Sequence, residues 1–147
     1  MSSLPRIDIH AHAFHPKIAS KVVEQLQQHY GIPAIGNGLL EDMEPRLRRA
    51  GIQYSAVLAA ATKKEQVKPA NQYAVSLLKH PGVIPFGTMH PDYEKMDEML
   101  AYLWDNGIRG IKLHPDYQGF VADDERMFPI YEKIGSLGMI PVFHAGV

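Results

Sequence analysis

The chain has 147 residues, of which 46% are hydrophobic and 21% charged, and a formal net charge of −1 at pH 7. This length suits a single domain over residues 1–147, and the composition is typical of a globular protein. The balanced charge gives no sign of a nucleic-acid partner, and no apolar run approaches the roughly 18 residues of a membrane span. The chain has no cysteine, which excludes disulfides and thiolate chemistry. Since no signal-peptide pattern is present either, we expect a cytoplasmic protein.

Short apolar runs alternate with helical periods along the chain. The apolar runs predict strands, and the recurrence of apolar residues at i, i+3, i+4 and i+7 predicts helices. In chain order we predict a strand at 6–10, a helix at 17–30, a loop at 31–38, a helix at 39–50, a strand at 54–60, a helical face at 70–78, a strand at 83–89, a helical face at 96–104, a strand at 108–113, a helical face at 127–137 and a strand at 139–143.

Several boundaries carry their own signals. Pro45 inside the second helix predicts a kink or a late start, and Gly51 is well placed to end that helix. Pro69 suits the first turn of the third helix, because its missing N–H costs little there. Asp123 or Asp124 can cap the last helix.

The alternation of strand and helix predicts parallel pairing through right-handed crossovers. The strands are nearly all apolar, as expected for a sheet buried on both faces. Doubly wound sheets and (β/α)8 barrels share this pattern. The polar candidates, however, follow strands one, three, four and five, at the sheet end where barrel active sites lie. We therefore predict an α/β chain of the (β/α)8 TIM-barrel type that supplies the first five strand units.

Two histidines, His10 and His12, lie at the end of the first predicted strand and just beyond it. Alternate residues of a strand share a face, so the two imidazoles can bind one Zn²⁺ or a similar divalent ion. A structural or solvent-exposed pair is the alternative. His144 follows the fifth predicted strand and is placed for a third ligand, unless it is a buried histidine with one hydrogen bond. Asp8 shares their parity and could orient a ligand or satisfy polar groups inside the barrel.

Lys112 and His114 share a face of the fourth predicted strand and are our candidate catalytic residues. A lysine inside a barrel is costly unless paired. Lys112 could bridge metals after carbamylation, neutralise a substrate carboxylate or pair with a buried acid such as Asp8. His114 could contact substrate or move a proton. The other candidates for substrate contact are His90, Tyr117 and His15, the last of which suits a helix start equally well.

Three segments together resemble the amidohydrolase superfamily. They are Ile-Asp-Ile-His-Ala-His at 7–12, Gly-Ile-Lys-Leu-His-Pro at 110–115 and Pro-Val-Phe-His-Ala-Gly at 141–146. The nearest branch is amidohydrolase family 2, metal-dependent hydrolases of TIM-barrel fold that include the aminocarboxymuconate-semialdehyde decarboxylase type. The resemblance implies metal binding by His10, His12 and His144, with a further histidine on strand six and an aspartate on strand eight. This chain departs from the family because it has no strands six to eight.

The resemblance implies an enzyme that hydrolyses an amide, ester or lactone of a small molecule through a metal-activated water. Non-oxidative decarboxylation of an unsaturated or aromatic acid in the same site is the alternative. A non-catalytic truncated fragment or scaffold is a second alternative. Five strands would also expose the lumen face and two sheet edges, which favours a homo-oligomer.

Overall fold

The fold is a five-stranded parallel sheet in which each strand pairs with the one before it, in the order β1-β2-β3-β4-β5. The computed structural model describes residues 4–145. Gly146 of the third motif and the first three residues of the chain lie outside this range. The strands are β1 (Ile7–Ala11), β2 (Tyr54–Leu58), β3 (Val83–Thr88), β4 (Gly110–Leu113) and β5 (Ile140–Phe143).

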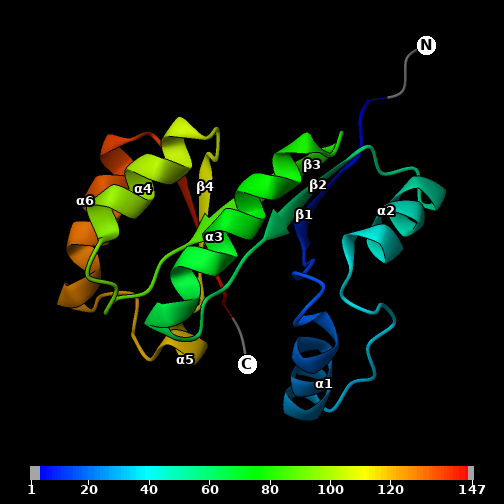
Figure 1. The fold of residues 1–147 in the computed structure, drawn as a ribbon, viewed down its shortest axis with the longest axis horizontal. Coiled ribbons are helices and arrows are strands. Elements are labelled where there is room, and N and C mark those ends of the chain that lie inside the picture. The colour runs from blue at the N-terminus through cyan, green and yellow to red at the C-terminus, as the bar shows by residue number, and fades with distance from the viewer. Residues whose placement is uncertain (1–3, 146–147) are drawn as a thin grey trace.

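Helices fill the connections between the strands. In Figure 1, α1 and α2 lie beside β1, α3 crosses in front of the sheet, and α4 and α6 lie beside β4. A doubly wound sheet reverses its strand order at a switch point, and this sheet does not. The fold is therefore a curled half-barrel of the (β/α)8 type, as the sequence predicted. The helices are α1 (Ala19–Tyr30), α2 (Leu40–Arg49), α3 (Val67–Ser76), α4 (Met96–Asp105), α5 (Pro115–Gln118) and α6 (Phe128–Ser136).

Most predicted boundaries agree with the structure to within two or three residues. Gly51 follows α2 with a φ of 71°, a left-handed conformation that favours glycine. Pro69 lies in the first turn of α3, and the Asp124 side chain accepts the Arg126 N–H just before α6. A late start at Pro45 was wrong, because α2 begins at Leu40 and continues through the proline. Only one carbonyl loses its partner to Pro45, and on this exposed helix water can replace it.

The main core lies between the sheet and helices α3, α4 and α6. Ile111 and Leu113 of β4 are fully buried there. Because side chains alternate along a strand, Lys112 and His114 face the opposite, inner side. Gly110 shares that side, where the Phe86 ring occupies the space a Cβ would need. The inner face of β4 therefore carries a glycine, a lysine and a histidine in succession.

The two sheet edges, β1 and β5, expose apolar side chains. Ile9 of β1 is 77% exposed and Ile140 of β5 is 59% exposed. Each of these strands has one neighbour in the part of the chain that the structure describes. Within residues 4–145, no helix is long and apolar enough to cross a membrane.

Candidate active site

The imidazoles of His10 and His12 meet at the carboxyl end of β1. Their Nε2 atoms are 3.1 Å apart, and the ring centroids are 5.0 Å apart. The strand pairing shifts register between Asp8 and Ala11, so β1 is irregular where the two histidines leave it. The Asp8 carboxylate accepts the backbone N–H of His10 at 3.0 Å. Asp8 thus holds the backbone of His10 in this bent strand end and forms no hydrogen bond to a ring.

A carbonyl of the neighbouring strand fixes the tautomer of His12. Its Nδ1 lies 3.0 Å from the Leu58 oxygen at the end of β2. A carbonyl only accepts, so Nδ1 carries the proton and Nε2 keeps its lone pair. Burial lowers the pKa of His12, the hydrogen bond to Leu58 partly opposes this shift, and the charges of His10 and Lys112 lower the pKa further. The pKa of His10 is lowered by burial and by Lys112. Both shifts favour the neutral imidazole.

His144 joins a stack of three rings at the mouth of the half-barrel. The His114 ring lies over His144 with centroids 3.9 Å apart and over Tyr117 with centroids 4.1 Å apart. The two interplanar angles are 10° and 15°. Burial, followed by the charges of His144 and Lys112, lowers the pKa of His114 to about 4. The stack therefore holds His114 as a neutral imidazole. His144, at the other side of the stack, also lowers the pKa values of His10 and His12.

Lys112 lies below this stack on β4 and is 0% exposed. Its Nζ has no hydrogen-bond partner among residues 4–145. No ion pair joins it to Asp8 in this part of the chain, so pairing with that acid was wrong as an explanation of the buried amine. Burial lowers the pKa of Lys112.

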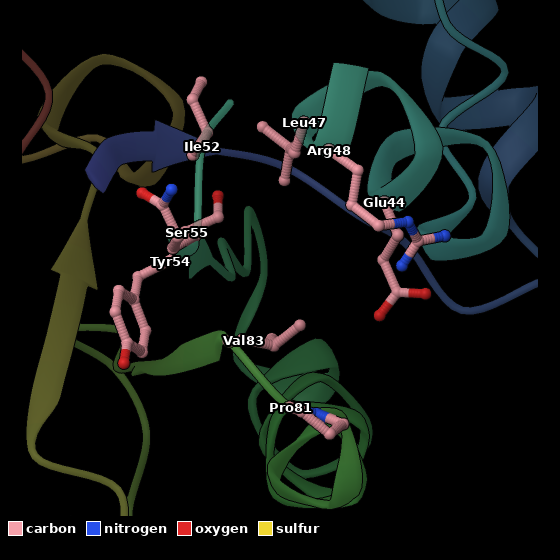
Figure 2. A pocket seen from close by; sticks show the side chains of 10 residues that line it. Glu44, Leu47, Arg48, Ile52, Tyr54, Ser55, Pro81 and Val83 are labelled. Atoms are coloured by element: carbon pink, nitrogen blue, oxygen red, sulfur yellow. The ribbon is translucent and has the colours of Figure 1, made fainter. Parts of the chain in front are cut away.

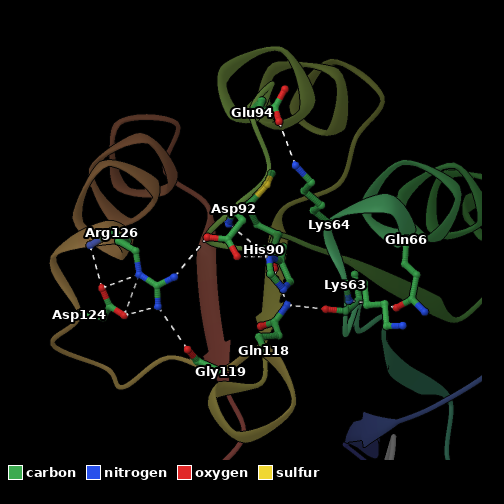
Figure 3. Close-up of polar contacts among 12 residues, drawn as sticks. Lys63, Lys64, Gln66, His90, Asp92, Glu94, Gln118, Gly119, Asp124 and Arg126 are labelled. Atoms are coloured by element: carbon green, nitrogen blue, oxygen red, sulfur yellow. Dashed lines mark hydrogen bonds and ion pairs between the residues drawn. The ribbon is translucent and has the colours of Figure 1, made fainter.

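Gln118, which lies outside every predicted element, organises the ends of three strands (Figure 3). It is the last residue of α5 and is buried. Its Nε2 donates to the carbonyls of Ala61 and Met89 at 2.7 and 2.6 Å, and its Oε1 accepts the His114 N–H at 2.8 Å. These bonds join the segments after β2, β3 and β4. Nothing in the local sequence indicates such a role, because the three partners are backbone groups 4, 29 and 57 residues away.

His90 and His15 occupy different surroundings. His90 is 7% exposed, and its Nδ1 accepts the Asp92 N–H, with Asp92 in turn paired to Arg126 (Figure 3). The His15 ring packs edge-on against Tyr73, and its Nδ1 accepts the Lys17 N–H in the turn before α1. The hydrogen bond from the Lys17 N–H to His15 stabilises the turn that leads into α1, as expected for a residue at a helix start. A role of His90 or His15 in substrate contact stays a prediction.

Comparison with known proteins identifies the family of this chain. The amidohydrolase family profile matches residues 7–147. The chain belongs to the amidohydrolase family. No curated protein matches the chain. Among solved structures, it resembles the crystal structure of a probable 2-pyrone-4,6-dicarboxylic acid hydrolase from Acinetobacter baumannii with citric acid bound, at a TM-score of 0.59 and 16% sequence identity.

The comparison covers 97% of this amidohydrolase chain and 50% of the solved structure, so the chain spans about half of that protein's length. At 16% sequence identity, the likeness, which has a TM-score of 0.59, shows the fold alone. The half-barrel aligns with about half of that solved structure, and β1 and β5 are its edge strands in the described residues.

Amidohydrolases generally use a divalent metal, and the His10–His12 pair fits one. Two imidazole nitrogens, each at 2.0–2.1 Å from a tetrahedral ion, would stand about 3.3 Å apart. The observed separation of 3.1 Å is close to that value. The hydrogen bond from His12 Nδ1 to a carbonyl is the arrangement that typically orients a metal-bound histidine. Within residues 4–145, no three or more metal-ligating side chains form one group, so His144 as a third ligand stays a prediction.

The amidohydrolase chain also has a small hollow of about 40 Å³ at the opposite end of the sheet (Figure 2). It lies where β2 and β3 begin, next to α2, whereas the histidines lie where strands end. The lining includes Ser55, whose Oγ is buried without a partner in the described residues. Because barrel active sites lie at the carboxyl ends of the strands, we assign no role in catalysis to this hollow.

Proposed function

We propose that this amidohydrolase is a metal-dependent hydrolase that cleaves an amide, ester or lactone bond of a small molecule. One observation carries the proposal. His10 and His12 present two Nε2 atoms 3.1 Å apart, within hydrogen-bond distance, and the Leu58 carbonyl keeps the His12 proton on Nδ1, so that the His12 Nε2 lone pair faces His10. Neutral imidazoles in this arrangement suit Zn²⁺, our expected metal, or a similar divalent ion. A cytoplasmic setting belongs to the same proposal.

The roles of the chain's own residues follow from their positions. A divalent ion at His10 and His12, with His144 as the proposed third ligand, would lower the pKa of a coordinated water toward neutrality and polarise a carbonyl. His114 is neutral near pH 7 and lies at the mouth, where its imidazole can contact the substrate or accept a proton. Tyr117 covers the outer face of the His114 ring and limits its rotation.

A second reaction, non-oxidative decarboxylation of an unsaturated or aromatic acid, suits the same residues. The observation that favours it is Lys112, a buried amine without a partner in the described residues, on the strand that carries His114. The two reactions differ in the bond that breaks. Hydrolysis releases an acid together with an alcohol or amine, and decarboxylation releases CO₂.

The test is a product assay on the purified protein loaded with Zn²⁺. Lactones, esters, amides and unsaturated acids are each followed for acid release and for CO₂ release. We expect acid release that falls at least about a hundredfold in His12→Ala, because loss of a catalytic metal ligand removes the activation of water. His80→Ala, which lies just before β3 at the opposite end of the sheet from His12, is the matched control and keeps full activity. CO₂ release without acid release would assign the alternative reaction instead.

A further inference from the structure

Lys112 is the most unusual ionisable residue of the inner face. It is 0% exposed, and its Nζ and the Ser55 Oγ are the buried side-chain polar atoms without a partner in residues 4–145. Its backbone is fixed, because its carbonyl accepts the Thr88 hydroxyl at 2.9 Å and it lies in register with Thr88 and Val142. The sheet therefore fixes the backbone of Lys112, and the amine starts from the inner face of β4.

The charges around Lys112 are unbalanced. The charge of Lys112 lowers the pKa values of His10, His12 and His114, and none of these three side chains is a carboxylic acid. The negative charge of Asp8 raises the pKa of His10, but the Asp8 carboxylate already accepts the backbone N–H of that residue. The described part of this face thus holds an amine and several imidazoles, with no carboxylate bonded to the amine.

A buried ammonium is stable only with a partner of opposite charge. A carboxylate is the anion that this face fits best, since one amine donates well to one carboxylate oxygen in a charge-assisted hydrogen bond. A phosphate needs more donors, typically arginine side chains or a glycine-rich helix start. Here the short α5 begins with Pro115, which has no N–H to offer, and in the described residues no arginine is among the charged groups that shift the pKa values of the three histidines near Lys112.

We propose that the Lys112 amine binds a carboxylate group of the substrate and holds it next to the His10–His12 pair. The assignment of that carboxylate to a substrate rests on the proposed function, whereas binding of a carboxylate to the amine does not. A buried lysine without a bound carboxylate also lowers the free energy of unfolding of the ligand-free protein. Replacing it with methionine, which has a similar volume and no charge, should therefore stabilise the protein while weakening carboxylate binding.

The test uses the metal-free protein, so that turnover and metal binding play no part. Calorimetry compares acetate, glutarate and benzoate with acetamide, glutaramide and benzamide, which match them in shape and lack the charge. We expect at least one acid to bind more tightly than its amide. Lys112→Met should raise the dissociation constant of that acid by about tenfold or more. Lys68→Met, an exposed lysine on α3, should leave it unchanged.

Urea unfolding of the same variants gives a second readout. Lys112→Met should unfold at a higher urea concentration than the unmodified protein. The proposal is wrong if no acid binds better than its amide, or if Lys112→Met binds the acids as tightly as Lys68→Met. It is also wrong if Lys112→Met is clearly destabilised, because the amine would then stabilise the empty fold instead of weakening it. A protein that binds acids through Lys112 but hydrolyses nothing would contradict the proposed function alone.

Discussion

The imidazole of His114 is buried and has His144 and Lys112 as neighbours. Burial lowers its pKa to about 4 from an ordinary value of 6.5, and His144 and Lys112 add to the shift. The parity of Lys112 and His114 on one strand face is a local property, and the sequence predicts it. The stacking of His114 between Tyr117 and His144 is not local, because it depends on β5 lying beside β4.

This pKa shift predicts how stability changes with pH. The folded state favours neutral His114, so its contribution is fully present above about pH 6.5 and is lost as the pH falls toward 4. Between pH 7.5 and 4.5, the unmodified protein should lose about 2 kcal/mol more unfolding free energy than His114→Gln, which cannot titrate. Urea unfolding at the two pH values measures the difference. Equal losses in both proteins would show that His114 titrates normally.

At the level of elements, the short helix α5 connects the site to the sheet. Gln118 uses three side-chain hydrogen bonds to hold the segments after β2, β3 and β4 together. The sequence predicted the long helices and all five strands, because periodicity is a local signal. It missed α5, because four residues are too few to show a period. It also expected a late start at Pro45, where exposure of the helix makes the lost hydrogen bond tolerable.

Gln118→Met should destabilise the protein by about 2–4 kcal/mol, since it leaves two carbonyls and one N–H buried without partners. Urea unfolding at pH 7.5 provides the free energy. Gln72→Met, on the exposed side of α3, is the matched control and should change the stability by less than about 0.5 kcal/mol. If the two variants unfold alike, the bonds of Gln118 do not hold the strand ends together.

At the level of the whole molecule, the open edges are the dominant feature. The exposed Ile9 on β1 and Ile140 on β5 lie on strands that have one neighbour each in the described residues. The sequence could predict five parallel strands and a barrel-type site, since both follow from the order of the elements. The meeting of His10 with His12 was also predictable from their spacing. The bond between His12 and Leu58 was not, because it depends on how β1 and β2 are paired.

These edges predict self-association of the 147-residue chain. Sedimentation velocity should show a concentration-dependent shift to larger species, and Ile9→Lys should reduce it by placing a charge on the β1 edge. Ile32→Lys is the matched control, since Ile32 is 67% exposed but lies in a loop after α1. A monomer at every concentration, or equal effects of the two lysines, would contradict an edge-to-edge contact.

The metal content of the purified protein tests the central claim most directly. After loading with Zn²⁺ and dialysis, the unmodified protein and His80→Ala should each retain about one ion per chain. The double variant His10→Ala/His12→Ala should retain almost none, because it lacks the two Nε2 atoms that face each other at 3.1 Å. Equal zinc in all three proteins would contradict a metal site at the end of β1.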